Sequence, residues 1–284
     1  MISRPFREMD SAACRRAQEA IVWLHEFEGT VEGFAGHVFA VLGWLVEVTY
    51  IECGCLNRRT GACRSSTSIP LENGEERGEI YMRLKNCSPL FSLDPDVWGE
   101  RVLGNRDFFT DREYRSLPLY REVLLPGGIQ HELGMVIPDG EWLLVLGFFR
   151  TEARPYTERE RQLLEVVRPH LGRVFRLAQL RAWESASPAE KIRLIHPQLT
   201  ARQRQVLAGI CEGMGNRELS DALGISLESV RTHRKAAFAR LGVRTPVEAV
   251  MSVAGSGAAG LPLPMPDGNR GWSWSPGRRL RGAP

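Results

Sequence analysis

Three polar residues near the carboxyl end of the 284-residue chain, Arg231, Thr232 and Lys235, have the types and spacing needed to contact DNA bases. Arginine and lysine donate hydrogen bonds to O6 and N7 of guanine, and threonine offers a methyl or hydroxyl group to a base edge. On an α-helix these residues lie at roughly 100–200° from an apolar stripe. That stripe comprises Val230, Ala237 and Leu241. One helix would therefore bury its apolar side and present a cationic side to the major groove, which is ~12 Å wide.

Four short helices are predicted around these residues. Ser or Thr three residues before Glu or Gln forms a capping box, and this pattern marks the first and fourth helices at Thr200 and Thr245. Gly213, Gly224 and Gly242 end the first three helices. Four helices with such short connections are typical of an all-α helix-turn-helix domain, here expected over 199–254.

The distribution of charge supports a polyanionic partner for this end of the chain. The formal net charge is +3, but residues 199–250 carry eight Arg or Lys against five Asp or Glu, and residues 255–284 carry four against one. The rest of the chain is mildly acidic. Charge alone would favour an ordinary solvated helix face, and it is the four-helix framework that favours nucleic-acid binding.

A series of short motifs occurs at fixed spacing across the same region. The motifs are Leu199-Thr200-Ala-Arg202, Val206-Leu207, Gly213, Asn216-Arg217-Glu218-Leu219, Leu223-Gly224-Ile225-Ser226, Val230-Arg231-Thr232-His233, Leu241-Gly242-Val243 and Glu248-Ala249-Val250. Together they resemble the C-terminal DNA-binding domain of the LuxR/GerE family of bacterial transcription regulators. The resemblance covers about a fifth of the chain. Two positions depart from the family pattern, since Gln203 stands where a glutamate is usual and Gly215 where a serine is frequent.

The resemblance implies roles for individual residues. The helix 227–240 would be the recognition helix, with Arg231, Thr232 and Lys235 at base-contacting positions. Residues near phosphates would be Thr200, Arg202, Asn216, Arg217 and Arg234. The fourth helix would help to pair two copies of the domain on a palindromic site through Ala249, Val250 and Val253.

A long helix is predicted to begin at the capping box of Thr157 and Glu160 and to end near Trp183. It carries an apolar seam with alternating spacings of three and four residues, as in a two-stranded coiled coil. The seam comprises Leu164, Val167, Leu171, Val174 and Ala178. A second stripe comprises Leu163, Val166 and Leu177. One face is expected to pack on the protein's own sheet and the other on a partner chain, unless both belong to the same core.

The N-terminal region, 1–183, is predicted to be an α+β sensor-like domain with an antiparallel sheet and helices. Helices are expected within 10–46 and 111–124, and strands at 45–55, 130–137 and 142–149, the last two joined by a tight turn at 138–141. Residues 108–176 resemble, less specifically, GAF- or PAS-like sensor domains. The spaced Trp, Tyr and Asp-Pro pattern of acyl-homoserine-lactone pockets is not evident.

Other features exclude or leave open further functions. Cys53 and Cys55 would share one face of a strand, where they could be core residues or a thiol sensor. No second histidine follows His131-Glu132 or His25-Glu26 at the spacing of a zinc hydrolase, and no nucleophile elbow or phosphate loop occurs, so we expect no enzyme activity, cofactor or metal. No apolar stretch reaches the ~20 residues of a membrane span, and a cytoplasmic protein is expected. Residues 184–198 are predicted to be a linker, and 255–284 a disordered Gly/Pro-rich basic tail.

The sequence therefore predicts a transcription regulator that binds double-stranded DNA as a homodimer controlled by its N-terminal domain. RNA polymerase and a small-molecule effector are candidate partners. The alternative is an interaction protein that does not bind DNA, in which the C-terminal helices dock another protein and the N-terminal domain binds a small molecule.

Overall fold

The computed structural model describes residues 9–57, 63–70, 80, 83–84, 87–90, 95–140 and 142–254. The chain divides into two compact units, the first ending at Phe175 and the second beginning at Arg176. This division falls within one long helix, α6 (Glu158–Ser185). All described strands belong to the first unit, whereas the described part of the second unit is helical. This agrees with the predicted α+β domain followed by an all-α domain.

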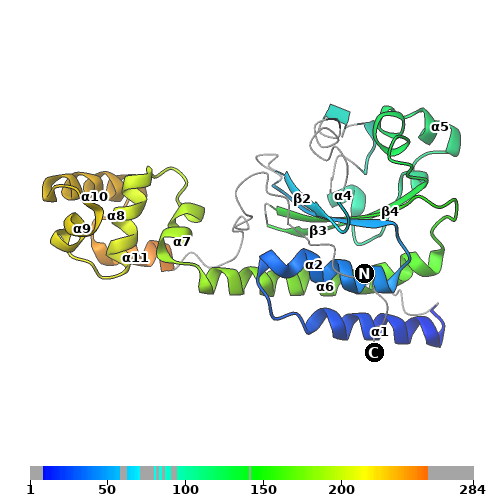
Figure 1. Cartoon of the computed structure of the whole chain (residues 1–284), viewed down its shortest axis with the longest axis horizontal. Helices are drawn as coiled ribbons and strands as arrows, with labels where there is room; N and C mark the ends of the chain where they lie inside the picture. Colours follow the sequence, from blue (N-terminus) through cyan, green and yellow to red (C-terminus); the bar gives the residue numbers. More distant parts are fainter. Residues whose placement is uncertain are drawn as a thin grey trace. The chain divides into compact units, whose positions relative to one another are not determined.

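The described strands of the first unit form an antiparallel sheet in the order β2-β1-β4-β3 (Figure 1). The strands are β1 (Tyr50–Asn57), β2 (Cys63–Thr67), β3 (His131–Asp139) and β4 (Trp142–Arg150). β3 and β4 form the predicted hairpin. Gly140 in its turn has a φ of 62°, a conformation that residues with a Cβ rarely adopt. β3 and β4 are thus antiparallel neighbours, and β1 pairs with the other edge of β4.

Helices cover both faces of this sheet (Figure 1). On one side lie α1 (Ser11–His25), α2 (Val31–Leu45) and α6; on the other lie α4 (Pro95–Trp98) and α5 (Asp111–Ser116). Two further short helical turns, η3 (Asn105–Asp107) and η4 (Tyr120–Leu124), flank α5 in sequence. Trp98 packs with Leu103, Val136 and Leu143 to form an apolar cluster on this second side.

The first strand begins at Tyr50 rather than at the predicted Leu45. Helix α2 continues through Leu45 because its apolar residues recur at helical spacing and are buried. Val38, Val41 and Leu42 are each 0% exposed. The β-branched residues that favoured a strand over 45–49 therefore lie at the end of the helix and in the connection after it.

Helix α6 has nearly the predicted bounds, but its apolar seam is buried within the single chain. Each seam residue is at most 1% exposed; they are Leu164, Val167, Leu171, Val174 and Ala178. Arg168 donates a hydrogen bond to the carbonyl of Val136 on β3 (2.7 Å), and the Phe175 ring packs on Phe34 of α2 with 4.9 Å between centroids. A partner chain could reach the seam only if this core opened, so the structure contradicts the predicted coiled-coil role.

Arg150, the last residue of β4, is the largest fully buried side chain and is 1% exposed. Its guanidinium donates hydrogen bonds to the carbonyls of Glu47 and of residues 154–155, and it forms an ion pair with Glu160 at 3.0 Å. The same group lies 4.0 Å from the ring centroid of Tyr156. Arg150 therefore joins the end of the sheet to the segment before β1 and to the first turn of α6.

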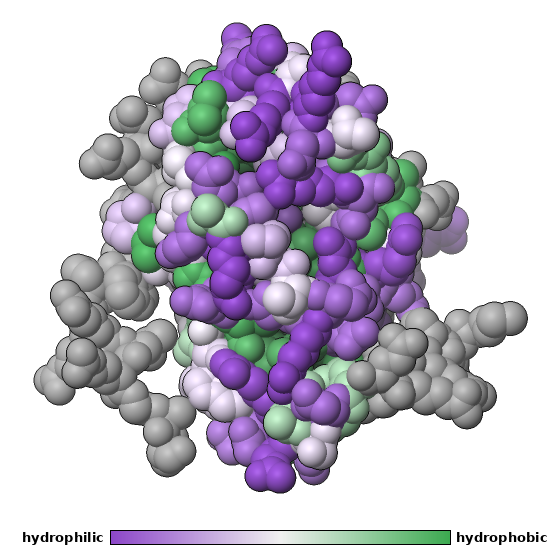
Figure 2. All heavy atoms as spheres, turned by 90° about the vertical axis from the view of Figure 1, so that its right-hand side faces the viewer, coloured by the Kyte–Doolittle hydropathy of each residue, from purple (hydrophilic) through white to green (hydrophobic). Residues whose placement is uncertain are grey.

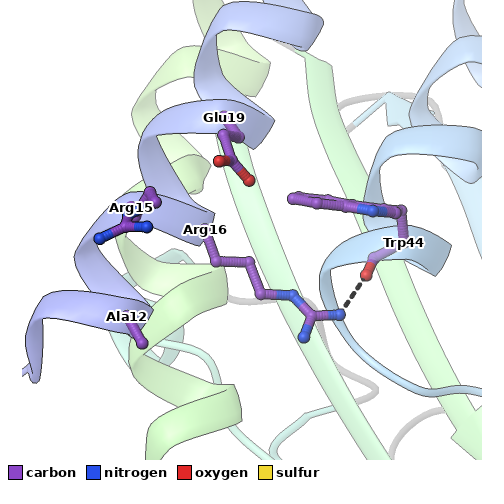
Figure 3. Close-up of a pocket in the computed structure, with 5 residues that line it drawn as sticks. All are labelled: Ala12, Arg15, Arg16, Glu19 and Trp44. Atoms are coloured by element: carbon purple, nitrogen blue, oxygen red, sulfur yellow. Dashed lines mark hydrogen bonds between the residues drawn. The ribbon is translucent and has the colours of Figure 1, made fainter. Parts of the chain in front are cut away.

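An open surface pocket lies between α1 and α2 (Figure 3). It is lined by Ala12, Arg15, Arg16, Glu19 and Trp44. Arg16 donates a hydrogen bond to the carbonyl of Trp44 (2.5 Å), and its guanidinium is 5.2 Å from the Trp44 ring centroid. Because this carbonyl belongs to the last turn of α2, Arg16 caps a helix end and joins the two helices.

Cys53 and Cys55 are buried on β1, 5% and 3% exposed. Burial, reinforced by the neighbouring charge of Glu52, raises the pKa of the Cys53 thiol to about 12, so little reactive thiolate forms at neutral pH. Within the described part of the chain, no three His, Cys, Asp or Glu side chains are grouped to hold a metal ion. These observations favour the packing alternative for the two cysteines over a thiol sensor.

The segment predicted as a linker contains a helix, α7 (Pro188–Ile195), which belongs to the second unit. Ser187 and Glu190 form a capping box at its start. Ile192 is 0% exposed and lies in the same core cluster as Leu199 and Phe238. Part of the predicted linker, 188–195, is therefore helical, and an apolar residue of this segment completes the core of the C-terminal helices.

The predicted tail, 255–284, lies outside the described residues. No helix in the described part combines the length and the apolar character of a bilayer-spanning segment. The face of the molecule seen in Figure 2 is mostly hydrophilic, with hydrophobic residues in small separate patches.

Candidate nucleic-acid interface

The C-terminal unit contains the four predicted helices, α8 (Ala201–Cys211), α9 (Asn216–Leu223), α10 (Leu227–Leu241) and α11 (Pro246–Ala254). Their apolar residues form two clusters. The first contains Ile192, Leu199, Leu207, Ala208, Ala237, Phe238, Ala249 and Val253; the second contains Val206, Leu219 and Val230. Helix α10 contributes to both clusters, so its rotation about its own axis is fixed by packing on the helices around it.

The turn between α9 and α10 sets the direction of the predicted recognition helix. Gly224 ends α9 in the left-handed conformation, with a φ of 61°. Ser226 then caps α10, since its hydroxyl accepts a hydrogen bond from the backbone N–H of Ser229 at 3.1 Å. The Ser220 hydroxyl donates to the carbonyl of Ile225 (2.6 Å) and closes the turn from the other side.

The two sides of α10 differ as the sequence predicts. Val230 and Ala237 are 0% and 1% exposed, whereas Arg231, Thr232 and Lys235 are exposed. Within the described part of the chain, Arg231 forms a loose surface ion pair with Glu228, at 3.5 Å one turn earlier on the same helix. Such a pair contributes little to stability, so the guanidinium can exchange it for a base or a phosphate at small cost.

Most of the predicted phosphate contacts lie at helix N-termini. Thr200 is the N-cap of α8, and Asn216 and Arg217 begin α9; Arg202 and Arg217 are exposed. Free backbone N–H groups and the helix dipole favour a phosphate at such positions. Arg234 differs, because it is half-buried and donates a hydrogen bond to Oδ1 of Asn216 at 3.0 Å. It holds α10 against α9.

A partly buried contact that the sequence did not reveal joins the start of α8 to the end of α10. Oε1 of Gln203, a residue that is 5% exposed, accepts hydrogen bonds from Arg240 (2.8 Å) and from the backbone N–H of Thr200 (3.0 Å). Arg240 also donates to the carbonyl of Gln198 at 3.0 Å. Residues so far apart in sequence follow no local spacing rule, so only the fold brings them together.

Gln203→Glu is expected to stabilise the C-terminal unit by about 1 kcal/mol at neutral pH. A carboxylate facing Arg240 would make the hydrogen bond charge-assisted, which is roughly twice as strong as a neutral one. Thermal unfolding of the full chain, monitored at the transition of the C-terminal unit, measures this effect. Gln203→Leu is the matched control and should unfold earlier than the wild type. A Glu variant no more stable than the Leu variant would contradict this account.

Helix α11 places its apolar residues differently from the predicted pairing surface. Ala249 and Val253 are 0% and 4% exposed and face the core of the unit, so the structure contradicts a direct pairing role for them. Val250 is half-buried. Two large apolar side chains of α11 are presented to solvent, Val247 (71% exposed) and Met251 (63% exposed), one turn apart. The helical period, which turns Ala249 and Val253 inward, turns these two outward.

Comparison with known proteins identifies this unit. Residues 197–253 match the family described as bacterial regulatory proteins, luxR family. The C-terminal unit is a luxR-family domain. The members of that family are transcription regulators, not enzymes, and the sequence resemblance to LuxR/GerE proteins is confirmed.

Beyond the luxR-family domain, similarities are more distant. The chain is 26% identical over 136 residues to the monoamine regulon transcriptional regulator of Klebsiella aerogenes, which covers 48% of this chain and 55% of that protein. The match thus spans about half the length of this relative. Among solved structures, Escherichia coli SdiA is 18% identical with a TM-score of 0.44, covering 87% of this chain and 98% of SdiA. The ligand-binding domain of Pseudomonas aeruginosa VqsR is 14% identical, with a TM-score of 0.43 over 60% of this chain and 97% of that domain.

Proposed function

We propose that this chain is a transcription regulator that binds double-stranded DNA by inserting α10 into the major groove. The observation that carries the proposal is the division of α10, with Val230 and Ala237 buried and Arg231, Thr232 and Lys235 exposed on the other side. The three exposed side chains contact base edges. The N-termini of α8 and α9 supply phosphate contacts that fix the position of the helix on the duplex.

The test is selection of bound sequences from a random pool of duplex DNA, using the full chain. It should return a defined half-site, and the symmetry of the selected sequences reports whether two copies bind together. Affinity for the selected site should fall steeply between about 50 and 200 mM salt, because neutralised phosphates release counterions. No enrichment, or an affinity that salt does not change, would instead support the alternative of a protein-docking module.

We propose that two copies of the C-terminal unit pair on DNA through the outward face of α11. Val247→Glu and Met251→Glu should each weaken binding to a two-half-site DNA by about tenfold or more while leaving single half-site binding unchanged, since each buries a charge in an apolar contact. Electrophoretic mobility shifts with both DNAs measure the difference. Val22→Glu on α1 (Val22 is 55% exposed) is the matched control and should change neither. Equal loss on both DNAs would contradict pairing through α11.

We further propose that the N-terminal unit binds a small-molecule effector and thereby controls DNA binding. One buried donor, Nε1 of Trp98, has no hydrogen-bond partner in the described part of the chain. Such a donor is costly unless an acceptor meets it, and a carbonyl or ether oxygen of an uncharged ligand would do so. Thermal shifts against a panel of neutral metabolites test this; the absence of any shift favours a constitutive regulator.

RNA polymerase in the cytoplasm is the partner through which such a regulator would act.

A further inference from the structure

Two histidines from distant parts of the sequence meet in the N-terminal unit. His25 is the last residue of α1, and His170 lies in α6. Nε2 of His25 is 3.0 Å from Nδ1 of His170, and the two rings are nearly perpendicular, at 87° with 5.2 Å between centroids. His25 is exposed and His170 half-buried, so solvent reaches the pair.

The three helices around the pair are held together by contacts that do not involve either ring. Helix α1 buries one side completely, with Ala13, Ala17, Ala20 and Leu24 each 0% exposed. The bond from Arg16 to Trp44 joins α1 to α2, and the contact between Phe34 and Phe175 joins α2 to α6. In Figure 1, α1, α2 and α6 accordingly lie side by side. The two imidazoles are therefore brought together by the fold and do not have to assemble it.

The separation of the two nitrogens suits metal coordination. Imidazole nitrogens bind transition metals at about 2.0–2.1 Å, so two nitrogens 3.0 Å apart would subtend an angle of about 94° at a shared ion. That angle is close to the right angle between neighbouring ligands in square-planar and octahedral sites, and smaller than the tetrahedral angle that zinc prefers.

We propose that His25 and His170 form a two-imidazole binding site for a divalent transition-metal ion, with Cu²⁺ preferred to Ni²⁺ and Zn²⁺. At present one ring donates its N–H to the other. On metal binding that proton moves, through water, to the other nitrogen of the same ring, so both facing nitrogens offer lone pairs and no net proton is released. No third protein ligand is grouped with them among the described residues, so water completes the coordination.

The charge of the site sets limits on its affinity. Burial, followed by the neighbouring His25 and Arg173, lowers the pKa of His170. The cation of Arg173 opposes a bound metal ion, and two ligands hold a metal less tightly than three or four. The site therefore suits exchangeable binding of a metal ion.

The test is titration of the metal-free full chain with Cu²⁺ in a non-coordinating buffer, by calorimetry and electron paramagnetic resonance. Wild type should bind one equivalent with a spectrum showing two nitrogen ligands. His25→Gln and His170→Gln should each weaken that equivalent by about tenfold or more and remove one nitrogen. Glu26→Gln, which changes the exposed residue next to His25, is the matched control and should leave both readouts unchanged.

Equal affinity and an equal spectrum in wild type and His25→Gln would overturn the proposal, as would the absence of a two-nitrogen signal in wild type. Because His25 ends a helix and is exposed, its variant should fold even if His170→Gln does not; the metal-free unfolding temperature checks this. DNA binding by His25→Gln in the absence of metal should equal that of wild type, so failure here is separate from failure of the proposed function.

Discussion

Lys235→Ala is expected to weaken binding to the selected DNA site by about 1–3 kcal/mol, roughly five- to 150-fold, and to relax preference at one base pair. The exposed ammonium group lies on the side of α10 opposite the buried stripe, where a guanine in the major groove can accept its hydrogen bonds. Arg231→Ala should have an effect of similar size at a different position. Fluorescence anisotropy with the selected site and single-base variants measures both affinity and preference.

A matched control separates base contact from simple loss of charge. Arg112→Ala removes one exposed positive charge from α5 in the N-terminal unit, and it should alter neither affinity nor preference appreciably. If Lys235 contacted only phosphate, its loss would weaken all sequences equally and reduce the salt dependence by about one ion. Unchanged affinity and unchanged preference for Lys235→Ala would remove this residue from the base-contacting set.

Arg150→Met is expected to destabilise the N-terminal unit by about 3 kcal/mol. Removing one partner of a buried ion pair is costly, and here Glu160 keeps only the exposed Arg154 as an ion partner while the carbonyls of Glu47 and residues 154–155 lose a donor. Methionine retains much of the apolar volume, so the loss reports mainly on the polar contacts. Urea unfolding of the full chain, followed for the transition of this unit, is the measurement.

Arg154→Met is the control for this prediction, because Arg154 pairs with the same Glu160 but its side chain is 52% exposed. Its replacement should cost less than about 1 kcal/mol.

Burial alone would raise the pKa of Glu160, but hydrogen bonds from Thr157 and Arg150 outweigh it and lower that pKa. The ion pair therefore stabilises the protein above the usual carboxyl pKa, and its contribution is lost as the pH falls through the lowered value. The difference in stability between wild type and Arg150→Met should accordingly decrease at acid pH, leaving the part due to the backbone carbonyls.

Local patterns in the sequence were enough to predict the elements that depend on neighbouring residues. The capping residues Thr200 and Thr245 begin the helices as expected, and Gly224 and Gly242 end helices in left-handed conformations. The division of α10 into an apolar and a cationic side follows from the helical period alone. These features are determined by contacts within a few residues, which is why they could be predicted from one sequence.

What the sequence could not decide was which apolar surfaces meet one another. The seam of α6 has the spacing of a coiled coil, yet it is buried within the single chain; Ala249 and Val253 face their own core; and Ile192 of α7 lies in the core of the C-terminal unit. An apolar stripe predicts that a helix face is buried, but it does not predict which element covers that face. The contacts of Arg150, the bond between Gln203 and Arg240, and the pairing of His25 with His170 likewise depend on the tertiary structure, because they join residues with no fixed spacing along the chain.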